Sequence, residues 1–203
     1  AIVNALEDVD RISNIVRALL LLSQAETGQV ALHRQPVNLT EVVAELVEQF
    51  DISATEAGLH LRSELQPDVV ISGDRTQMDR LVANLLANAL KYTPPGGHVR
   101  VTVRTEGDNA IIAVADSGKG IPPASLPHIF DRFYRVPGED PDKGLGLGLS
   151  FVNWIVKAHQ GRIDVSSEVG LGTTFSIVLP LNAPVPVLED APADSIRLAE
   201  ARQ

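Results

Sequence analysis

Cysteine is absent from the 203 residues of this chain, and long apolar runs are absent as well. Without cysteine the protein has no disulfide bond, no thiolate nucleophile and no cysteine-ligated zinc. The longest uninterrupted apolar run is the six residues 110–115, whereas a helix that crosses a bilayer needs about 20. No segment of this chain is therefore expected to span a membrane.

Basic residues are also scarce. Lysine and arginine total 17 against 26 acidic residues, so the net charge is −9 and the pI is about 5.0. A protein that neutralises many phosphates presents a basic surface, so we expect no nucleic-acid partner. Hydrophobic residues make up 44% of the chain, which is enough for a buried core. The chain does not open with the basic and apolar regions of a secretory signal, and a cytoplasmic location is expected.

The first part of the chain has the pattern of one long amphipathic helix. Apolar residues recur at spacings of three and four from Ile2 to Leu20, with charged residues between them. We expect this helix to run to about Glu26 and to stop at Gly28. Such a helix buries its apolar stripe in a helical bundle or coiled coil, or else it is a strut packed on the next domain.

The rest of the chain predicts an α+β fold, with helices packed on one face of a mostly antiparallel sheet. A composition shift at 33–36 marks a boundary, and the proline-rich acidic segment after Pro180 has the composition of a disordered tail. The expected units are 1–35, a domain at 36–181 and a tail at 182–203. Within the domain we expect helices at 38–57, 74–92 and 148–159, and strands at 59–65, 69–71, 99–105, 110–115, 162–166 and 173–179.

Three polar residues share one face of the predicted helix 74–92. Asn84 and Asn88 are four residues apart and Lys91 follows three residues later, so all three project from the same side. Asparagine is unfavourable within a helix because its amide competes for backbone hydrogen bonds, so the pair indicates a polar task. Either both amides satisfy buried backbone groups, or they supply oxygen ligands for Mg²⁺ while the lysine binds phosphate.

Two glycine-rich motifs flank a possible lid. Asp116-Ser117-Gly118-Lys119-Gly120 directly follows a predicted strand, so Asp116 either closes an Asx turn or faces a cavity. Gly144-Leu145-Gly146-Leu147-Gly148 leads into a helix, where bare amides favour an anion unless the loop is only a hinge. Between them, the aromatic and guanidinium groups of 130–135 are typical of a lid that closes over a nucleotide.

Together these segments resemble the N, G1, F and G2 boxes of sensor histidine kinases. The boxes are Asn84–Thr93, Asp116–Gly120, Phe130–Arg135 and Gly144–Gly148, in the family's order and spacing. Gly172-Thr173-Thr174-Phe175 and Leu179-Pro180 match the family's usual ending. The resemblance covers residues 38–180 and implies the GHKL ATP-binding sandwich, with ATP and Mg²⁺ as cofactors. The first helix resembles the second helix of the family's dimerisation and histidine-phosphotransfer hairpin.

The resemblance also implies roles for individual residues. Asp116 would accept a hydrogen bond from the adenine amino group, and Thr174 would assist through water. Asn88 and Asn84 would hold Mg²⁺. Lys91, with Arg132 or Arg135, would contact the phosphates, so catalysis is assigned to Asn84, Lys91 and Arg132. The other residues expected around ATP are Tyr92, Gly118, Gly120, Ile121, Phe133, Lys143, Gly144, Leu145, Gly146, Leu147, Gly148 and Leu149.

A member of this family is a protein kinase that phosphorylates a histidine and passes the phosphate to an aspartate of a response regulator receiver domain. The resemblance implies a homodimer formed through the helical hairpin, and membrane attachment only through upstream segments. Related ATPases of the gyrase and chaperone type carry a glutamate where this chain has Asn84, and an amide cannot act as a general base. A serine kinase of the anti-sigma type and a nucleotide-binding pseudokinase remain alternatives.

The family's phosphoacceptor is a histidine followed directly by an acidic residue. None of the five histidines of this chain has that neighbour, so we expect the acceptor to lie outside it. These histidines are His33, His60, His98, His128 and His159.

Overall fold

A five-stranded sheet forms one layer of the structure, a computed structural model that describes residues 32–138 and 145–181. The strand order is β2-β4-β5-β7-β6. β2 runs parallel to β4, and the other neighbouring pairs of this sheet are antiparallel. The mostly antiparallel sheet expected from the sequence is thereby confirmed. Its strands are β2 (His60–Leu65), β4 (His98–Glu106), β5 (Asn109–Asp116), β6 (Arg162–Glu168) and β7 (Gly172–Pro180).

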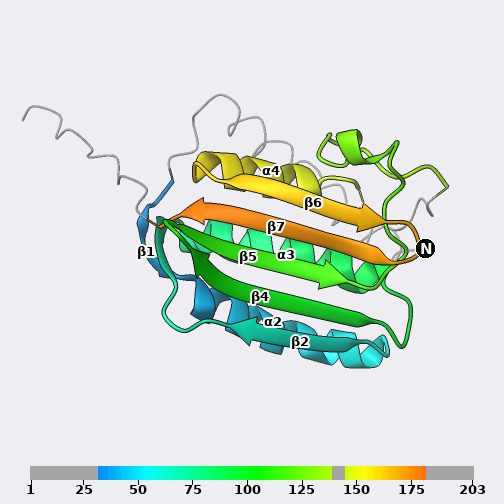
Figure 1. Ribbon diagram of the computed structural model, residues 1–203, viewed down its shortest axis with the longest axis horizontal. Helices are drawn as coiled ribbons and strands as arrows, with labels where there is room; N and C mark the ends of the chain where they lie inside the picture. Colours follow the sequence, from blue (N-terminus) through cyan, green and yellow to red (C-terminus); the bar gives the residue numbers. More distant parts are fainter. Residues whose placement is uncertain (1–31, 139–144, 182–203) are drawn as a thin grey trace, which may run out of the picture.

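Three helices form the second layer: α2 (Leu39–Glu56), α3 (Arg75–Tyr92) and α4 (Gly148–Ala158). In Figure 1 all three lie behind the sheet, and no helix of the described residues covers its near face. The predicted packing of helices on one face is therefore confirmed.

The core lies between the helices and the sheet. The strands contribute every second residue to it, because successive side chains of a strand point to opposite faces. Val101, Ile112 and Ile177 are fully buried in this way, and Leu81 and Leu86 of α3 meet them from the helix layer. Each such side chain contributes about 1.5–3 kcal/mol when it is removed from water. This core fixes α3 by its apolar face and leaves its polar face for the site.

Side-chain caps begin the two long helices where the sequence predicts them. The Asn38 side chain accepts a hydrogen bond from the Thr40 backbone N–H at the start of α2. Asp74 does the same for the Gln77 N–H at the start of α3. Each cap satisfies a donor that has no partner within its helix, which is worth about 1 kcal/mol.

The two short strands β1 (Gln35–Asn38) and β3 (Val70–Gly73) form a separate antiparallel pair. The sequence indicated only a boundary at 33–36. Four residues with one buried side chain, Val37, carry no alternation that could identify a strand. β1 is a strand because it pairs with β3, which lies more than 30 residues further along the chain, so no local pattern could reveal it.

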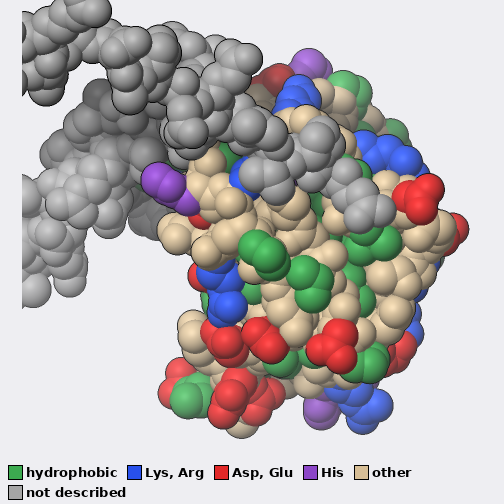
Figure 2. Space-filling view, turned by 90° about the vertical axis from the view of Figure 1, so that its left-hand side faces the viewer, with side chains coloured by type: hydrophobic (Ala, Val, Ile, Leu, Met, Phe, Trp, Pro, Cys, Tyr) green, Lys and Arg blue, Asp and Glu red, His purple; other side chains and the backbone are tan. Residues whose placement is uncertain are grey.

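The segment just before β1 is attached to the ends of two helices. The His33 backbone N–H donates to Asp74 Oδ2 at 3.1 Å, and Arg34 Nη2 donates to the Ala158 carbonyl at 2.8 Å. His159 is buried beside them, and its Nε2 accepts from the Asp74 N–H at 3.1 Å. Figure 2 views this end of the domain, where β1 lies; Asp116 lies at the opposite end of the sheet (Figure 1).

Some expectations fall outside the described residues: the first helix, the tail at 182–203, and two of the predicted site residues, Lys143 and Gly144. Within the segment expected to be a lid, Leu126–His128 form a short 3₁₀ helix, η1. Among the described residues, no helix is both long enough and apolar enough to cross a membrane.

Candidate functional site

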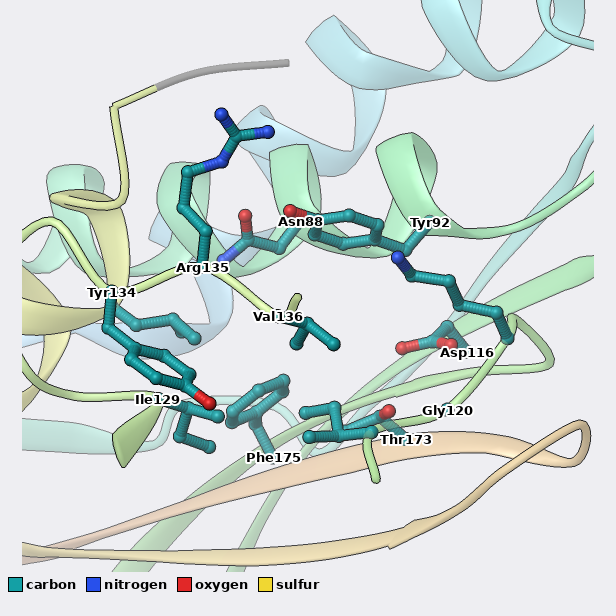
Figure 3. A pocket seen from close by; sticks show the side chains of 13 residues that line it. Asn88, Tyr92, Asp116, Gly120, Ile129, Tyr134, Arg135, Val136, Thr173 and Phe175 are labelled. Carbon is teal, nitrogen blue, oxygen red and sulfur yellow. The ribbon is translucent and has the colours of Figure 1, made fainter. Parts of the chain in front are cut away.

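Two adjoining cavities open between α3, the ends of β5 and β7, and the segment 120–136. The first has a volume of about 80 Å³ and the second about 400 Å³. In Figure 3, Asp116 and Thr173 lie on one side of the first cavity, and Asn88 and Tyr92 of α3 lie across it. One ligand can extend through both cavities because they share the residues Asn88, Tyr92, Ile129, Tyr134, Arg135 and Leu149.

Asp116 ends β5 and turns its carboxylate into the first cavity. Its Oδ1 also accepts a hydrogen bond from the Gly118 N–H at 2.8 Å, so the Asx turn and the cavity-facing position are both present. Burial raises the pKa of this carboxyl, and hydrogen bonds from the backbone of Gly118 and Thr173 partly oppose the rise. The first cavity thus holds a strong, partly desolvated hydrogen-bond acceptor in its wall.

The residue of β7 beside this carboxylate is Thr173, not Thr174. The pairing of β5 with β7 sets Asp116 opposite Thr173, and Thr173 lines the first cavity while Thr174 does not. Neighbouring strand residues face opposite sides of a sheet, so the two threonines cannot both point into the cavity. Thr173 is also anchored, since its hydroxyl lies 2.9 Å from Ser167 Oγ.

The polar face of α3 lines the second cavity, as the spacing of its residues predicts. Asn84, Asn88 and Lys91 all contribute to the wall. The Asn84 amide donates to the Arg80 carbonyl at 2.7 Å, so this asparagine does satisfy a backbone group. The Asn88 side chain makes no hydrogen bond to any other described residue, and its amide therefore faces the cavities with its bonding capacity unused.

Two ammonium groups lie against the Tyr92 ring at the end of α3. Lys91 Nζ is 4.4 Å from the ring centroid and Lys119 Nζ is 4.6 Å from it. Lys91 Nζ also donates to the Tyr92 hydroxyl at 2.8 Å. This cluster places positive charge where the two cavities meet, which favours an anionic or electron-rich ligand. Gly118 lines neither of these cavities; it lines a further groove, whose wall also contains Lys91, Tyr92 and Lys119.

The glycine-rich loop reaches the second cavity through residues 145–149. Gly146 has φ +70° and packs against the Tyr134 carbonyl, a conformation and a space that exclude a side chain. A Cβ at Gly148 would lie 2.8 Å from Asn84 Oδ1, so glycine lets the start of α4 approach α3. No side chain caps α4 at Leu147. Its first N–H groups are available to an anion.

Residues of the predicted lid form the remaining wall. Ile121, Ile129, Tyr134 and Val136 line the first cavity. The Phe133 N–H donates to the Gly146 carbonyl at 3.0 Å, which connects the segment to the glycine loop. Two predicted site residues, Phe133 and Arg132, line neither cavity, and the Phe133 side chain is 51% exposed.

Sequence reasoning missed several wall residues. Phe175 follows Thr173 by two positions on the same face of β7, which strand alternation would indicate once the register is known. Arg80 lies four residues before Asn84 on the same face of α3, so helical spacing alone pointed to it. Lys119, Tyr134 and Val136 come from loops, whose path no local pattern predicts.

The family model described as "Histidine kinase-, DNA gyrase B-, and HSP90-like ATPase" matches residues 73–183, more than half of the chain. The chain belongs to this family. That stretch contains all the residues that line the two cavities, including those of α3, Asp116 and the start of α4.

Within the family the chain is similar to sensor histidine kinases. It is 40% identical over 174 residues to the sensor histidine kinase RppB of Synechocystis sp., covering 84% of this chain and 38% of the relative. It is 36% identical over 180 residues to CusS of Escherichia coli K12, covering 86% of this chain and 36% of the relative. The chain thus spans little more than a third of the length of these curated relatives.

Solved structures give the same assignment. A mycobacterial sensor histidine kinase, MprB, aligns with a TM-score of 0.64 and 32% identity, over 72% of this chain and 97% of that one. The histidine kinase AdeS of Acinetobacter baumannii aligns with a TM-score of 0.73 and 25% identity, over 88% and 82%. Full-length ShkA in complex with AMPPNP aligns with a TM-score of 0.75 and 26% identity, over 86% and 36%. The domain is therefore the catalytic domain of a sensor histidine kinase.

Proposed function

We propose that this domain binds Mg²⁺ and ATP and transfers the γ-phosphate to a histidine on a helical hairpin. The observation that carries the proposal is the junction of two unlike cavities. The small one ends at a partly desolvated carboxylate, Asp116, and the large one is lined by amides, Lys91 and the uncapped start of α4. The first cavity suits a nucleobase, and the second suits a chain of phosphates.

Asp116 would select adenine. Its ionised carboxylate accepts hydrogen bonds only, and adenine offers an amino group where guanine offers an oxygen. With guanine the carboxylate would be left buried and facing a lone pair, which costs about 1–3 kcal/mol or more. Phe175 and Ile129 supply apolar surface for the faces of the ring (Figure 3).

Asn88 is the residue best placed to hold Mg²⁺, with Asn84 as the second amide. The Asn88 side chain lines both cavities and has no hydrogen bond to another described residue. Mg²⁺ binds through few protein oxygens and completes its shell with phosphate oxygens and water, so one or two amides suffice. Bound there, the ion supplies charge neutralisation to the phosphates. Lys91 and the amides of 145–149 would hold the phosphate chain.

Transfer to a protein side chain is favoured over hydrolysis. A general base for water would have to lie near the phosphates, and position 84 carries an amide, which has no proton-accepting capacity at working pH. The named relatives are sensor histidine kinases, which does not favour a serine kinase or an ATPase. A response regulator receiver domain as the final acceptor, dimerisation through the hairpin and membrane attachment through upstream segments are parts of this same proposal.

Titration calorimetry with Mg-ATP and Mg-GTP tests the nucleotide assignment. We expect ATP to bind at least tenfold more tightly than GTP, because about 1.4 kcal/mol corresponds to a factor of ten. Equal affinities for the two nucleotides would show that Asp116 does not select adenine. If neither nucleotide bound, the proposed function would be wrong.

A further inference from the structure

Arg80 lies at the part of the second cavity furthest along α3 from Tyr92, beyond the residues proposed to hold the base and Mg²⁺. The side chain is partly buried, and its guanidinium carbon lies 3.9 Å from the centroid of the Phe151 ring. This contact joins α3 to the first turn of α4. The guanidinium is therefore held in place by stacking on an aromatic ring.

The guanidinium lacks an acidic partner among the residues that the structure describes. Arg75, five residues earlier on α3, provides the contrast, because it pairs with Glu45 and Asp79 at the surface. Desolvation lowers the pKa of Arg80, and no nearby carboxylate offsets it. A cation that is partly removed from water without a counter-charge is unfavourable, and an anion bound beside it would relieve this cost.

The start of α4 faces the same space. Phe151 belongs to its first turn, and Leu147 provides no side-chain cap. The Ser150 hydroxyl donates to the Leu147 carbonyl at 2.7 Å, so it satisfies an acceptor and leaves the N–H groups open. Leu147, Gly148, Phe151 and Arg80 all line the second cavity. Two independent sources of positive potential, a guanidinium and a helix N-terminus, thus meet at one place.

The position along α3 identifies which phosphate this place would receive. A helix rises about 1.5 Å per residue, so Arg80 lies about 12 Å from Asn88 along the axis and further still from Tyr92. The base-sized cavity with Asp116 is at the Tyr92 end. A nucleotide that extends from Asp116 past Asn88 directs its last phosphate toward Arg80.

We propose that the Arg80 guanidinium, held on Phe151, binds the terminal phosphate of ATP and thereby distinguishes ATP from ADP. This inference rests on the proposed function, because it assigns a residue to the phosphate end of the same nucleotide. Arginine suits the role since its planar fork offers two parallel hydrogen bonds to phosphate oxygens. Loss of the guanidinium should then weaken a triphosphate and spare a diphosphate.

The test measures Kd by calorimetry for Mg-ADP and for a Mg-bound non-hydrolysable ATP analogue. We expect Arg80→Met to weaken the analogue about tenfold or more and to change ADP binding less than about twofold. Arg80→Lys should recover part of the loss, since it restores the charge without the fork. Arg75→Met is the matched control: it removes an arginine from the same helix outside both cavities and should leave both Kd values unchanged.

Phe151→Leu keeps an apolar side chain in the small cluster with Leu147 but removes the ring beneath the guanidinium. It should lower the preference for the triphosphate in the same direction as Arg80→Met, with a thermal midpoint near that of the wild type. Equal losses for ADP and the analogue in Arg80→Met, or no loss in either, would overturn the proposal while leaving the nucleotide site intact. If the wild type bound neither nucleotide, the proposed function would fall first and this assignment with it.

Discussion

Asp116 holds a charge where burial makes that charge costly. The desolvation that raises its pKa is the same effect that makes it a strong acceptor for a ligand donor in the first cavity. Such a residue lowers the stability of the empty domain and contributes to affinity once the ligand is bound.

The Asp116→Asn variant separates these two effects. At pH 7 we expect the nucleotide-free variant to unfold with a free energy a few tenths to about 1 kcal/mol higher than the wild type, because it carries no buried charge. The difference should shrink as the pH falls, since protonation of Asp116 removes the charge from the wild type too. ATP affinity should fall about tenfold or more. Urea unfolding at pH 5 and pH 7, with calorimetry, measures both; a less stable variant at pH 7 would contradict the account.

Asn88 differs from Asp116 because its side chain is uncharged and has no partner within the described residues. Asn88→Ala should therefore melt within about 2 °C of the wild type but lose most of the Mg²⁺-dependent part of its nucleotide affinity, as expected for a lost metal ligand. Asn153→Ala, in α4 and outside both cavities, is the matched control. Unchanged Mg-ATP affinity in Asn88→Ala would show that the metal site lies elsewhere.

At the scale of elements, the start of α3 and the end of α4 lie opposite the nucleotide cavities and form a joint with residues 33–34, the segment just before β1. His159 connects α4 to α3 through the Asp74 N–H, and its Nδ1 bonds the Ile155 carbonyl at 2.8 Å, so the ring is neutral with the proton on Nδ1. Desolvation lowers the pKa of His159, the hydrogen bond to the Ile155 carbonyl partly opposes this, and the charges of Arg34 and Asp74 act in opposite directions on it. Protonation would turn the Nε2 acceptor into a donor facing another donor.

This geometry predicts an acid-sensitive joint. The pKa of His159 is lower in the folded domain than its unfolded value of about 6.5, so the unfolded state binds the proton first and stability is lost as the pH falls below about 6.5. Asp116, with its raised pKa, acts in the opposite direction, so the comparison is made in the Asp116→Asn background. The free energy of unfolding of Asp116→Asn should fall more steeply from pH 7 to pH 5 than that of the double variant that carries both Asp116→Asn and His159→Gln. Parallel curves would exclude His159 as the source.

The lid is the other element with a testable property. Its described part contains the short η1 and contacts the glycine loop through the Phe133 N–H, with the Phe133 side chain half exposed. A nucleotide that occupies both cavities would add contacts to Tyr134 and Arg135. Trypsin should therefore cut at Arg132 and Arg135 in the free protein and at least several-fold more slowly with a non-hydrolysable ATP analogue. Equal cleavage rates would count against closure over the nucleotide.

At the scale of the whole molecule, the proposed function places the nucleotide and the phosphoacceptor histidine in different parts of the kinase. None of the five histidines precedes an acidic residue, and His159 is buried as a structural group. We expect this chain to bind γ-labelled ATP yet to incorporate no acid-labile label by itself. A separately added helical hairpin that carries the acceptor histidine should become labelled. Stoichiometric label on this chain alone would show that one of its own histidines is the acceptor.

The sequence by itself determined the local parts of this protein. Asn84, Asn88 and Lys91 share a helix face because a turn has 3.6 residues, and Asn38 and Asp74 cap their helices because the first N–H groups need acceptors. The alternating strands and the helical apolar faces were enough for the class of fold. Each of these features depends on residues close together in the chain.

The tertiary structure alone decided which distant residues meet. The register of β5 with β7 places Thr173 beside Asp116 in place of the predicted Thr174, and a shift of one residue would reverse that choice. β1 is a strand only because β3 pairs with it, and the Arg80 guanidinium stacks on an aromatic ring only because α4 brings Phe151 beneath it. Local patterns fix which way a side chain leaves its own element. What it faces there depends on pairing and packing between elements that are far apart in the sequence.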